Sequence, residues 1–220
     1  MKTEKISIIL PVYNRRHLIS RAVRSVQNQS YENWQLIIID DGSTDAVEND
    51  IEPLTRADSR VCFLRQERAG PAASRNRGIK RAEGKYITFI DSDDEYRKEH
   101  LQLRLEYMLE HPQVDVVHGG AELVGPEETH WVRDARNPQK WIHLSECYMA
   151  ATLFGKCSVF LESGGFRPLS YSAESEFIPR IEKKYRVVEF KTPTYRYYTG
   201  ISDSICGLKA KETTNQEDHE

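Results

Sequence analysis

The sequence has 220 residues, enough for one well-buried α/β domain or at most two small ones. It is 39% hydrophobic and 30% charged, a balance typical of a globular protein and not of a disordered chain. The formal net charge of −3 gives no overall basic bias, so we expect no nucleic-acid partner.

The first half of the sequence alternates patterns typical of strands and of helices. Helical periodicity and capping residues predict a helix over 16–29, one from Ser43 or Thr44 to about Leu54, one over 71–82 and one around 101–109. Because strands separated by helices form parallel sheets, we expect a mostly parallel central sheet with helices on both faces. Short apolar runs predict its five buried strands at 6–13, 34–39, 61–65, 85–90 and 114–118.

The second half is less regular. Residues 125–137 are polar and predict a loop or hairpin, and 174–185 predict a helix in which Pro179 is an awkward interior residue. A short strand is expected at 187–190. From residue 207 the sequence turns polar and predicts a frayed tail to residue 220.

The cysteines and the apolar stretches bear on compartment. No C-x-x-C pair is present, which gives little support to a zinc site. No apolar stretch approaches the roughly 20 residues of a membrane-spanning helix, so we expect a soluble, cytoplasmic protein, with peripheral association at the inner face of the membrane left open. The sequence has four cysteines, Cys62, Cys147, Cys157 and Cys206. We expect all four to be free thiols, although their spacing alone leaves a disulfide open.

Acidic turns follow two of the predicted strands, Asp40-Asp41 after the second and Asp91-Ser92-Asp93 after the fourth. Because parallel strands end at the same edge of a sheet, we expect both turns on one rim, where such sheets bind ligands. Two carboxylates on a turn can hold a divalent cation and leave positions for substrate oxygens. An isolated D-x-D is more often a solvated turn, but its place at the end of a buried strand favours a metal site.

The segment from Gly70 to Gly78 places small residues and Arg75 near a predicted helix start. A helix N-terminus with basic side chains suits an anion such as a diphosphate. The alternative is a helix packed on the sheet through its alanines, with solvated arginines, and the sequence favours neither.

Four ordered motifs carry a resemblance: Ser-Ile-Ile-Leu-Pro-Val-Tyr-Asn at 7–14, Ile-Ile-Ile-Asp-Asp-Gly-Ser-Thr-Asp at 37–45, Ala-Ser-Arg-Asn-Arg-Gly at 73–78, and Tyr-Ile-Thr-Phe-Ile-Asp-Ser-Asp-Asp at 86–94. Together they resemble family 2 glycosyltransferases. Gly-Gly-Phe at 164–166 and Tyr-Arg-Tyr-Tyr at 195–198 are also similar, so the resemblance covers roughly residues 5 to 205.

This resemblance implies a GT-A fold: a Rossmann-like, mostly parallel central sheet flanked by helices, with a smaller mixed acceptor-side part. It implies one domain over residues 1–206, with a nucleotide-binding half to about 120 and an acceptor-side half from about 121. A divalent cation, Mn²⁺ or Mg²⁺, is the implied cofactor, with Asp93 as the more direct ligand and Asp91 beside it. Residues implied at the nucleotide are Pro11, Val12, Tyr13, Asp41 (facing the base), Arg75, Asp91 and Ser92.

The catalytic base is where the sequence departs from the family. Members usually carry Glu-Asp at a helix start shortly after Gly-Gly-Phe. Here the alignment puts Glu174 on the base position and Ala173 on the preceding glutamate, with Glu176 as the reserve candidate. Glutamate can still accept a proton from a hydroxyl. The alternative is that both glutamates only complement the helix dipole.

The implied function is an inverting glycosyltransferase that moves a sugar from a nucleoside diphosphate, most often UDP, to a glycan or lipid-linked acceptor in cell-envelope synthesis. A non-catalytic nucleotide-sugar binding module is the alternative. A sugar nucleotidyltransferase is disfavoured, because 11–16 lacks the glycine-rich loop that this class needs. Oligomeric state stays open. Aromatic residues that could stack on sugars, or simply pack in the core, are Trp131, Trp141, Tyr148 and Tyr171.

Overall fold

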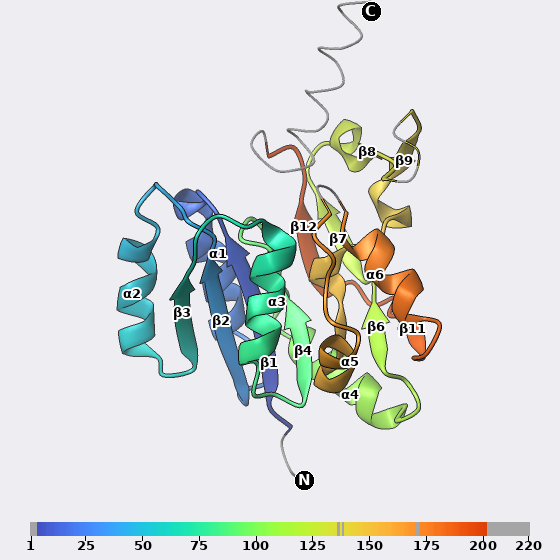
Figure 1. The fold of residues 1–220 in the computed structure, drawn as a ribbon, viewed down its shortest axis with the longest axis horizontal. Coiled ribbons are helices and arrows are strands. Elements are labelled where there is room, and N and C mark those ends of the chain that lie inside the picture. Colours follow the sequence, from blue (N-terminus) through green and yellow to red (C-terminus); the bar gives the residue numbers. More distant parts are fainter. Residues whose placement is uncertain (1–3, 136, 138, 170–171, 202–220) are drawn as a thin grey trace, which may run out of the picture.

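A seven-stranded sheet runs through the protein in the order β11-β6-β10-β4-β1-β2-β3 (Figure 1). The computed structural model describes residues 4–135, 137, 139–169 and 172–201. All neighbouring strands are parallel except at β10, which is antiparallel to both β4 and β6. The strands are β1 Ile6–Val12, β2 Trp34–Asp40, β3 Val61–Arg65, β4 Tyr86–Phe89, β6 Val116–His118, β10 Phe154–Lys156 and β11 Val187–Glu189.

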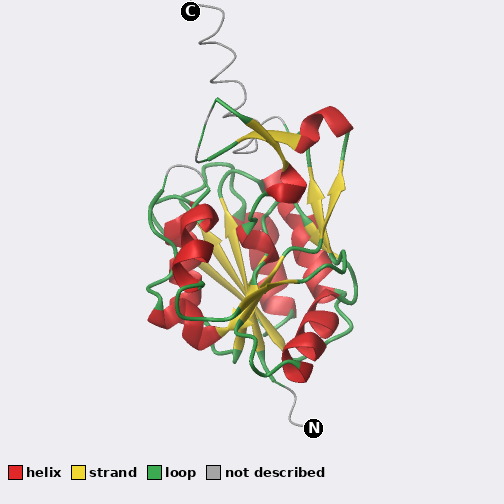
Figure 2. Cartoon of the chain, turned by 90° about the vertical axis from the view of Figure 1, so that its right-hand side faces the viewer, coloured by secondary structure: helices red, strands yellow, loops and turns green. Residues whose placement is uncertain are grey.

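Two smaller sheets stand beside the central one, and Figure 2 shows the β8–β9 hairpin near the end of the molecule opposite the N-terminus. They are built from β5 Glu95–Tyr96, β12 Tyr195–Tyr198 and β7 Ala121–Val124, and from β8 Trp131–Arg133 with β9 Trp141–His143. The α-helices are α1 Arg16–Gln27, α2 Glu48–Ala57, α3 Pro71–Arg81, α4 His100–Glu110, α5 Cys157–Glu162 and α6 Glu174–Ile181. The 3₁₀ helices are η1 Glu127–His130, η2 Leu144–Glu146 and η3 Ala150–Thr152.

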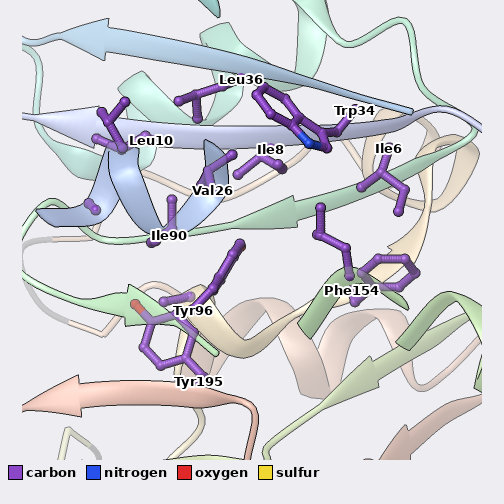
Figure 3. Packing of buried hydrophobic residues seen from close by; sticks show 14 of the residues in the cluster. Ile6, Ile8, Leu10, Val26, Trp34, Leu36, Ile90, Tyr96, Phe154 and Tyr195 are labelled. Carbon is purple, nitrogen blue, oxygen red and sulfur yellow. The ribbon is translucent and has the colours of Figure 1, made fainter. Parts of the chain in front are cut away.

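Strand β1 divides the core because its side chains alternate between the two faces of the sheet. Ile8 and Leu10 pack with residues of α1, α2 and α4 on one face, where Figure 3 shows them beside Val26 of α1. Ile9 packs with residues of α3, α5 and α6 on the other face. The predicted α/β layering, a mostly parallel sheet covered on both faces, is therefore confirmed.

Helix α3 lies unusually close to β1 at Gly78. A Cβ atom at this position would lie 2.4 Å from Cγ2 of Ile9, so only glycine allows this approach. The helix starts with Pro71 in its first turn, after Gly70 at φ +89°, as the sequence predicts. At the other end of α3, the N–H of Gly70 donates to Asp41 after β2 (2.8 Å), which places the start of the helix at the rim where β1 and β2 end.

Strand β10 is the part of the sheet that the sequence does not predict. It has only three residues, too few for a hydrophobic period, and it lies between β4 and β6. Its central Gly155 fits because a Cβ there would lie 2.7 Å from Cγ2 of Val116. A strand from the second half of the chain thus joins the two halves of one sheet.

Two predicted helix boundaries are wrong by four residues or more. Helix α2 begins at Glu48 and not at Ser43 or Thr44. The Ser43 hydroxyl accepts the backbone N–H of Asn14 (2.9 Å), so it fastens the turn after β2 to the end of β1. Helix α6 ends at Ile181 rather than at residue 185.

Pro179 lies in the interior of α6. It has no N–H to donate within the helix, and the helix ends two residues after it. Among the described cysteines, Cys62 and Cys157 are free thiols. In the part of the chain that the structure describes, no helix has the length and apolar character needed to cross a membrane. Cys206, Tyr171 and the predicted tail at 207–220 lie outside the described residues.

Candidate functional site

A cavity of about 840 Å³ opens where β1, β2 and β4 end, and the first turn of α6 and the inner side of the β8–β9 hairpin complete its wall. This volume is within the usual range for ligand sites. Glu176 does not line it. All the other predicted site residues do: Pro11, Val12, Tyr13, Asp41, Arg75, Asp91, Ser92, Asp93 and Glu174.

Asp41 follows β2 and is a buried carboxylate with four hydrogen-bond donors around it. Its Oδ1 accepts from Nε2 of Gln66 (2.7 Å) and from the N–H of Ala69 (2.9 Å). Its Oδ2 accepts from the N–H of Gly70 (2.8 Å) and is ion-paired with Arg68. Burial raises the pKa of Asp41, but these hydrogen bonds outweigh burial and hold the pKa below its usual value.

Asp41 should therefore make protein stability depend on pH. Its folded-state pKa is lower than that of the unfolded chain, so its contribution is complete above about pH 4 and is lost as pH falls through the folded value. We expect Asp41→Asn to lower the free energy of unfolding by about 1–3 kcal/mol at pH 7 and by less at pH 2.5. Urea unfolding at both pH values measures this, and an equal loss at both would contradict it.

Tyr13 lies beyond the end of β1 and opens toward the cavity. The guanidinium carbon of Arg68 lies 3.6 Å from the centroid of the Tyr13 ring, in a stacked cation–π contact. Arg68 thus contacts both Tyr13 and Asp41. Arg68 and Gln66 are site residues that sequence reasoning missed, and both lie in the short segment between β3 and α3.

Arg75, in α3, lies near two carboxylates of the site, those of Asp91 and Glu174. Its side chain is almost fully buried, and its Nη2 donates to Oδ1 of Asp91 (2.7 Å). Burial lowers the pKa of Arg75, but the charges of Asp91 and Glu174 raise it further, so the guanidinium stays protonated. Its buried Nε has no protein partner among the described residues. A cation thus stands between the acidic turn and Glu174.

The acidic turn after β4 is fastened to β12. The Tyr195 hydroxyl accepts the N–H of Asp91 (3.2 Å) and donates to Oδ2 of Asp94 (2.7 Å). Oδ1 of Asp94 accepts the N–H of Tyr198 (2.8 Å), and Arg21 donates to the carbonyl oxygen of Asp93. Asp94 and Tyr195 were not predicted. The family resemblance includes the segments at 86–94 and 195–198, in which these two residues lie. It does not predict their contact, which joins residues about a hundred positions apart.

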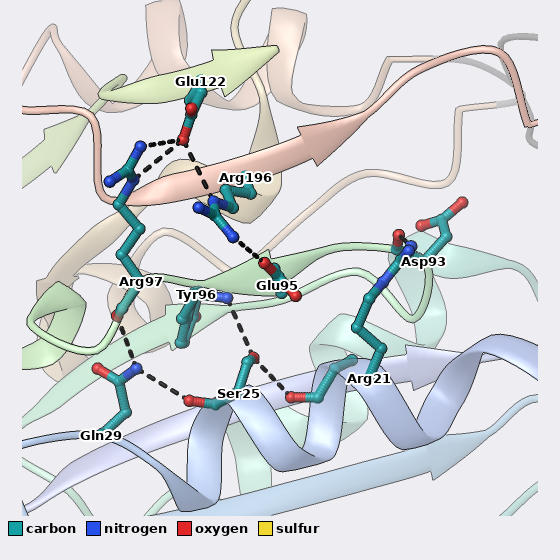
Figure 4. Close-up of polar contacts among 10 residues, drawn as sticks. Arg21, Ser25, Gln29, Asp93, Glu95, Tyr96, Arg97, Glu122 and Arg196 are labelled. Carbon is teal, nitrogen blue, oxygen red and sulfur yellow. Dashed lines mark hydrogen bonds and ion pairs between the residues drawn. The ribbon is translucent and has the colours of Figure 1, made fainter. Parts of the chain in front are cut away.

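The small β5-β12-β7 sheet is itself tied to α1 by polar contacts, which Figure 4 shows. The N–H of Tyr96 in β5 donates to Ser25 of α1 (3.0 Å). Arg196 of β12 is ion-paired with Glu95 of β5 (2.6 Å) and with Glu122 of β7 (3.4 Å). These contacts fix β12 and, through it, the acidic turn.

Asp91 and Asp93 fit a divalent cation. Burial and the negative charge of Asp91 raise the pKa of Asp93 to about 6, because the charges of Arg15 and Arg21 compensate only in part. Two carboxylates on one turn are a suitable partial ligand set for Mg²⁺ or Mn²⁺, which take their remaining oxygens from phosphate and water. Among the described residues, no group of three or more His, Cys, Asp and Glu could hold a metal.

Glu174 begins α6 and reaches the cavity, while Glu176 points elsewhere. Burial raises the pKa of Glu174 above its usual value, although the charge of Arg75 and a hydrogen bond from Ser172 Oγ (3.2 Å) lower it. Glu176 is ion-paired with Arg180 (2.7 Å) and Arg167 (3.1 Å). The structure therefore offers Glu174 as the accessible carboxylate.

The Gly-Gly-Phe turn is held by α3. Asn76 donates from Nδ2 to the carbonyl of Phe166 (2.7 Å) and accepts its N–H at Oδ1 (2.8 Å). A Cβ on Gly165 would lie 2.2 Å from Oδ1 of Asn76, so the turn needs glycine there. This contact joins the third predicted motif to the turn that precedes α6.

The described aromatic candidates differ in whether they line the cavity. Val132 and Ile142 form a cross-strand pair and line the cavity. Trp131 and Trp141 alternate with them and are about half exposed, and neither lines the cavity. Tyr148 does line the cavity.

Solved structures share this fold. The chain superposes on TarS 1-349 from S. aureus, in complex with UDP-GlcNAc, with a TM-score of 0.72 and 22% identity over 91% of this chain and 60% of that one. It also superposes on the mannosyltransferase PcManGT from Pyrobaculum calidifontis, in complex with GDP-Man and Mn²⁺, with a TM-score of 0.70 and 17% identity, covering 90% and 57% of the two chains.

A sequence relative and a family model add to this likeness. The chain is 38% identical over 120 residues to UDP-Glc:alpha-D-GlcNAc-diphosphoundecaprenol beta-1,3-glucosyltransferase WfgD of Escherichia coli, which covers 54% of this chain and 46% of that protein. The chain thus spans about half the length of this relative. The model of Glycosyl transferase family 2 matches residues 7–177, which include both acidic turns, Arg75 and Glu174, and the chain belongs to this family.

Proposed function

We propose that the protein is an inverting glycosyltransferase that moves a sugar from a UDP-sugar to an acceptor hydroxyl. The observation that carries this proposal is that one cavity gathers Asp41, Arg75, the Asp91–Asp93 pair and Glu174. These side chains provide, in order, a polar partner for a base, a fixed cation, a site for a divalent metal and a proton acceptor.

In this proposal the sugar donor binds at the rim where β1, β2 and β4 end. Tyr13 offers an aromatic face to the base, and Asp41 offers a buried carboxylate to a base N–H. Asp91 and Asp93 would hold Mn²⁺ or Mg²⁺, which when bound supplies positive charge to the departing diphosphate. UDP as the nucleotide is supported by the names of the E. coli relative and of the TarS complex.

Glu174 acts on the acceptor. As a general base it takes the proton of the acceptor hydroxyl, whose oxygen forms a bond to the anomeric carbon. The bond from this carbon to the diphosphate oxygen breaks on the opposite face, so the configuration inverts. Arg75 stays protonated, donates to Asp91 and places a positive charge near Glu174.

The acceptor side comprises residues from about 121 onward, and the nucleotide side those up to about 120. The β8–β9 hairpin and Tyr148 line the outer part of the cavity, where an acceptor glycan would lie. The name of the E. coli relative includes a diphosphoundecaprenol-linked sugar. A lipid-linked acceptor at the inner face of the membrane, in envelope glycan synthesis, is the corresponding proposal here.

Thermal unfolding and turnover together test the function. With Mn²⁺ present, UDP and UDP-sugars should raise the melting temperature, because a ligand that binds only the native state stabilises it. Release of UDP from a UDP-sugar should then require a glycan acceptor or proceed slowly to water. Stabilisation by UDP with no UDP release from any UDP-sugar would instead favour a nucleotide-sugar binding module.

A further inference from the structure

The place proposed for the base holds a side chain of the protein itself. Arg68 stacks on the Tyr13 ring and pairs with Asp41, and we call the space between these two residues the Tyr13–Asp41 slot. A guanidinium is flat and carries N–H donors along its edge. A nucleobase such as uracil is also flat and presents an N–H at its edge. Arg68 therefore presents to the slot the features by which a base would be bound.

Asp41 has no acceptor position left while Arg68 is in the slot. A carboxylate offers about four lone-pair positions, and here four donors take them: the N–H groups of Ala69 and Gly70 and the side chains of Gln66 and Arg68. A base N–H can reach Asp41 only if one of these donors leaves.

Arg68 is the donor that can leave. The two backbone donors belong to the turn that leads into α3. Gln66 is held by further contacts, with Arg77 donating to its Oε1 (3.3 Å) and its own Nε2 also reaching Ser74 (3.2 Å). The side chain of Arg68 is half exposed and can swing into solvent on a flexible stem.

We propose that Arg68 is an internal competitor of the nucleobase and sets the affinity of the donor site. Each donor that binds must first displace the guanidinium from the Tyr13–Asp41 slot, so the apparent affinity falls by the fraction of molecules in which the slot is open. This inference rests on the proposed function, because it takes the slot as the base site.

Titration calorimetry with UDP and Mn²⁺ tests the competition. Arg68→Ala should bind UDP about 3- to 30-fold more tightly than the parent, the range expected when a cation–π contact and a half-exposed ion pair no longer compete. Arg68→Lys keeps the positive charge but not the flat guanidinium. Its affinity for UDP should lie between those of the parent and Arg68→Ala. Arg81→Ala, at the exposed end of α3, removes an equal charge elsewhere and should not tighten UDP binding.

Inorganic diphosphate with Mn²⁺ is the second ligand, because it has no base. Arg68→Ala should not bind it more tightly than the parent does. UDP binding that is unchanged or weaker in Arg68→Ala, or an equal gain for inorganic diphosphate, would overturn the competition while leaving the proposed function intact. Absence of UDP binding in the folded parent and in every folded variant would overturn the proposed function and the competition with it.

Discussion

Replacing Glu174 with glutamine should reduce the rate of sugar transfer by about 10²- to 10⁴-fold, the usual contribution of a general base. Glutamine keeps the shape of the side chain but cannot accept the proton of the acceptor hydroxyl. Glu174 lies near Arg75 and Asp91 and not in the Tyr13–Asp41 slot proposed for the base. The affinity for UDP should therefore change little in Glu174→Gln. Steady-state kinetics and UDP calorimetry on the same preparation measure both effects.

The pH dependence of the transfer rate of the parent protein is a second test of Glu174 as the general base. Burial raises the pKa of Glu174, so the acidic fall in transfer rate should lie above the ordinary glutamic pKa of about 4.3. This limb should vanish in Glu174→Gln. Glu176→Gln, on the same helix but paired with Arg180, is the matched control and should keep most of the rate. A large loss only in Glu176→Gln would reverse the assignment of the base.

Replacing Asp93 with asparagine should lower metal-dependent turnover at least about 100-fold, because the charge that develops on the departing diphosphate loses its stabilisation. Asparagine keeps an oxygen ligand but not the negative charge, so higher Mn²⁺ concentrations should recover part of the rate. Initial rates across a Mn²⁺ titration measure this shift.

The control for Asp93→Asn is Asp50→Asn. Asp50 is an aspartate of α2, paired with Arg16 at the surface and absent from the cavity wall. It should leave the Mn²⁺ dependence unchanged. The metal assignment would be wrong if Asp93→Asn kept the rate and Mn²⁺ dependence of the parent.

The shared location of Asp41 and Asp93 could be predicted because it depends on topology alone. Buried apolar runs mark β2 and β4, both acidic turns follow them directly, and parallel strands bring their carboxyl ends to one rim. For Arg75 the same alternation predicts only a position near the start of α3, and its place at the nucleotide is what the family resemblance implies. These predictions need the order of elements and no side-chain packing.

The choice between Glu174 and Glu176 needs the tertiary structure. Both residues lie in the first turn of α6, and although the family alignment favours Glu174, the local pattern shows only that a helix starts there. The rotation of the helix depends on how Phe177 and Ile178 pack in the core, and this rotation turns Glu174 to the cavity and Glu176 to Arg167, outside α6.

Arg68 could not be predicted for a related reason. It lies in an irregular segment between β3 and α3, where no period shows which way a side chain points. Its place depends on two residues distant in sequence, Tyr13 and Asp41. Strand β10 and the start of α2 were missed in the same way, because long-range contacts and not local pattern decide them.

The central claim is that the two acidic turns bind one nucleotide and its metal in a single cavity. An anomalous-difference map from crystals grown with UDP and Mn²⁺ tests it most directly. We predict one strong manganese peak in contact with Asp93 and with the diphosphate, and uracil on the Tyr13 ring. A nucleotide bound outside this cavity, or manganese far from Asp91 and Asp93, would contradict the account.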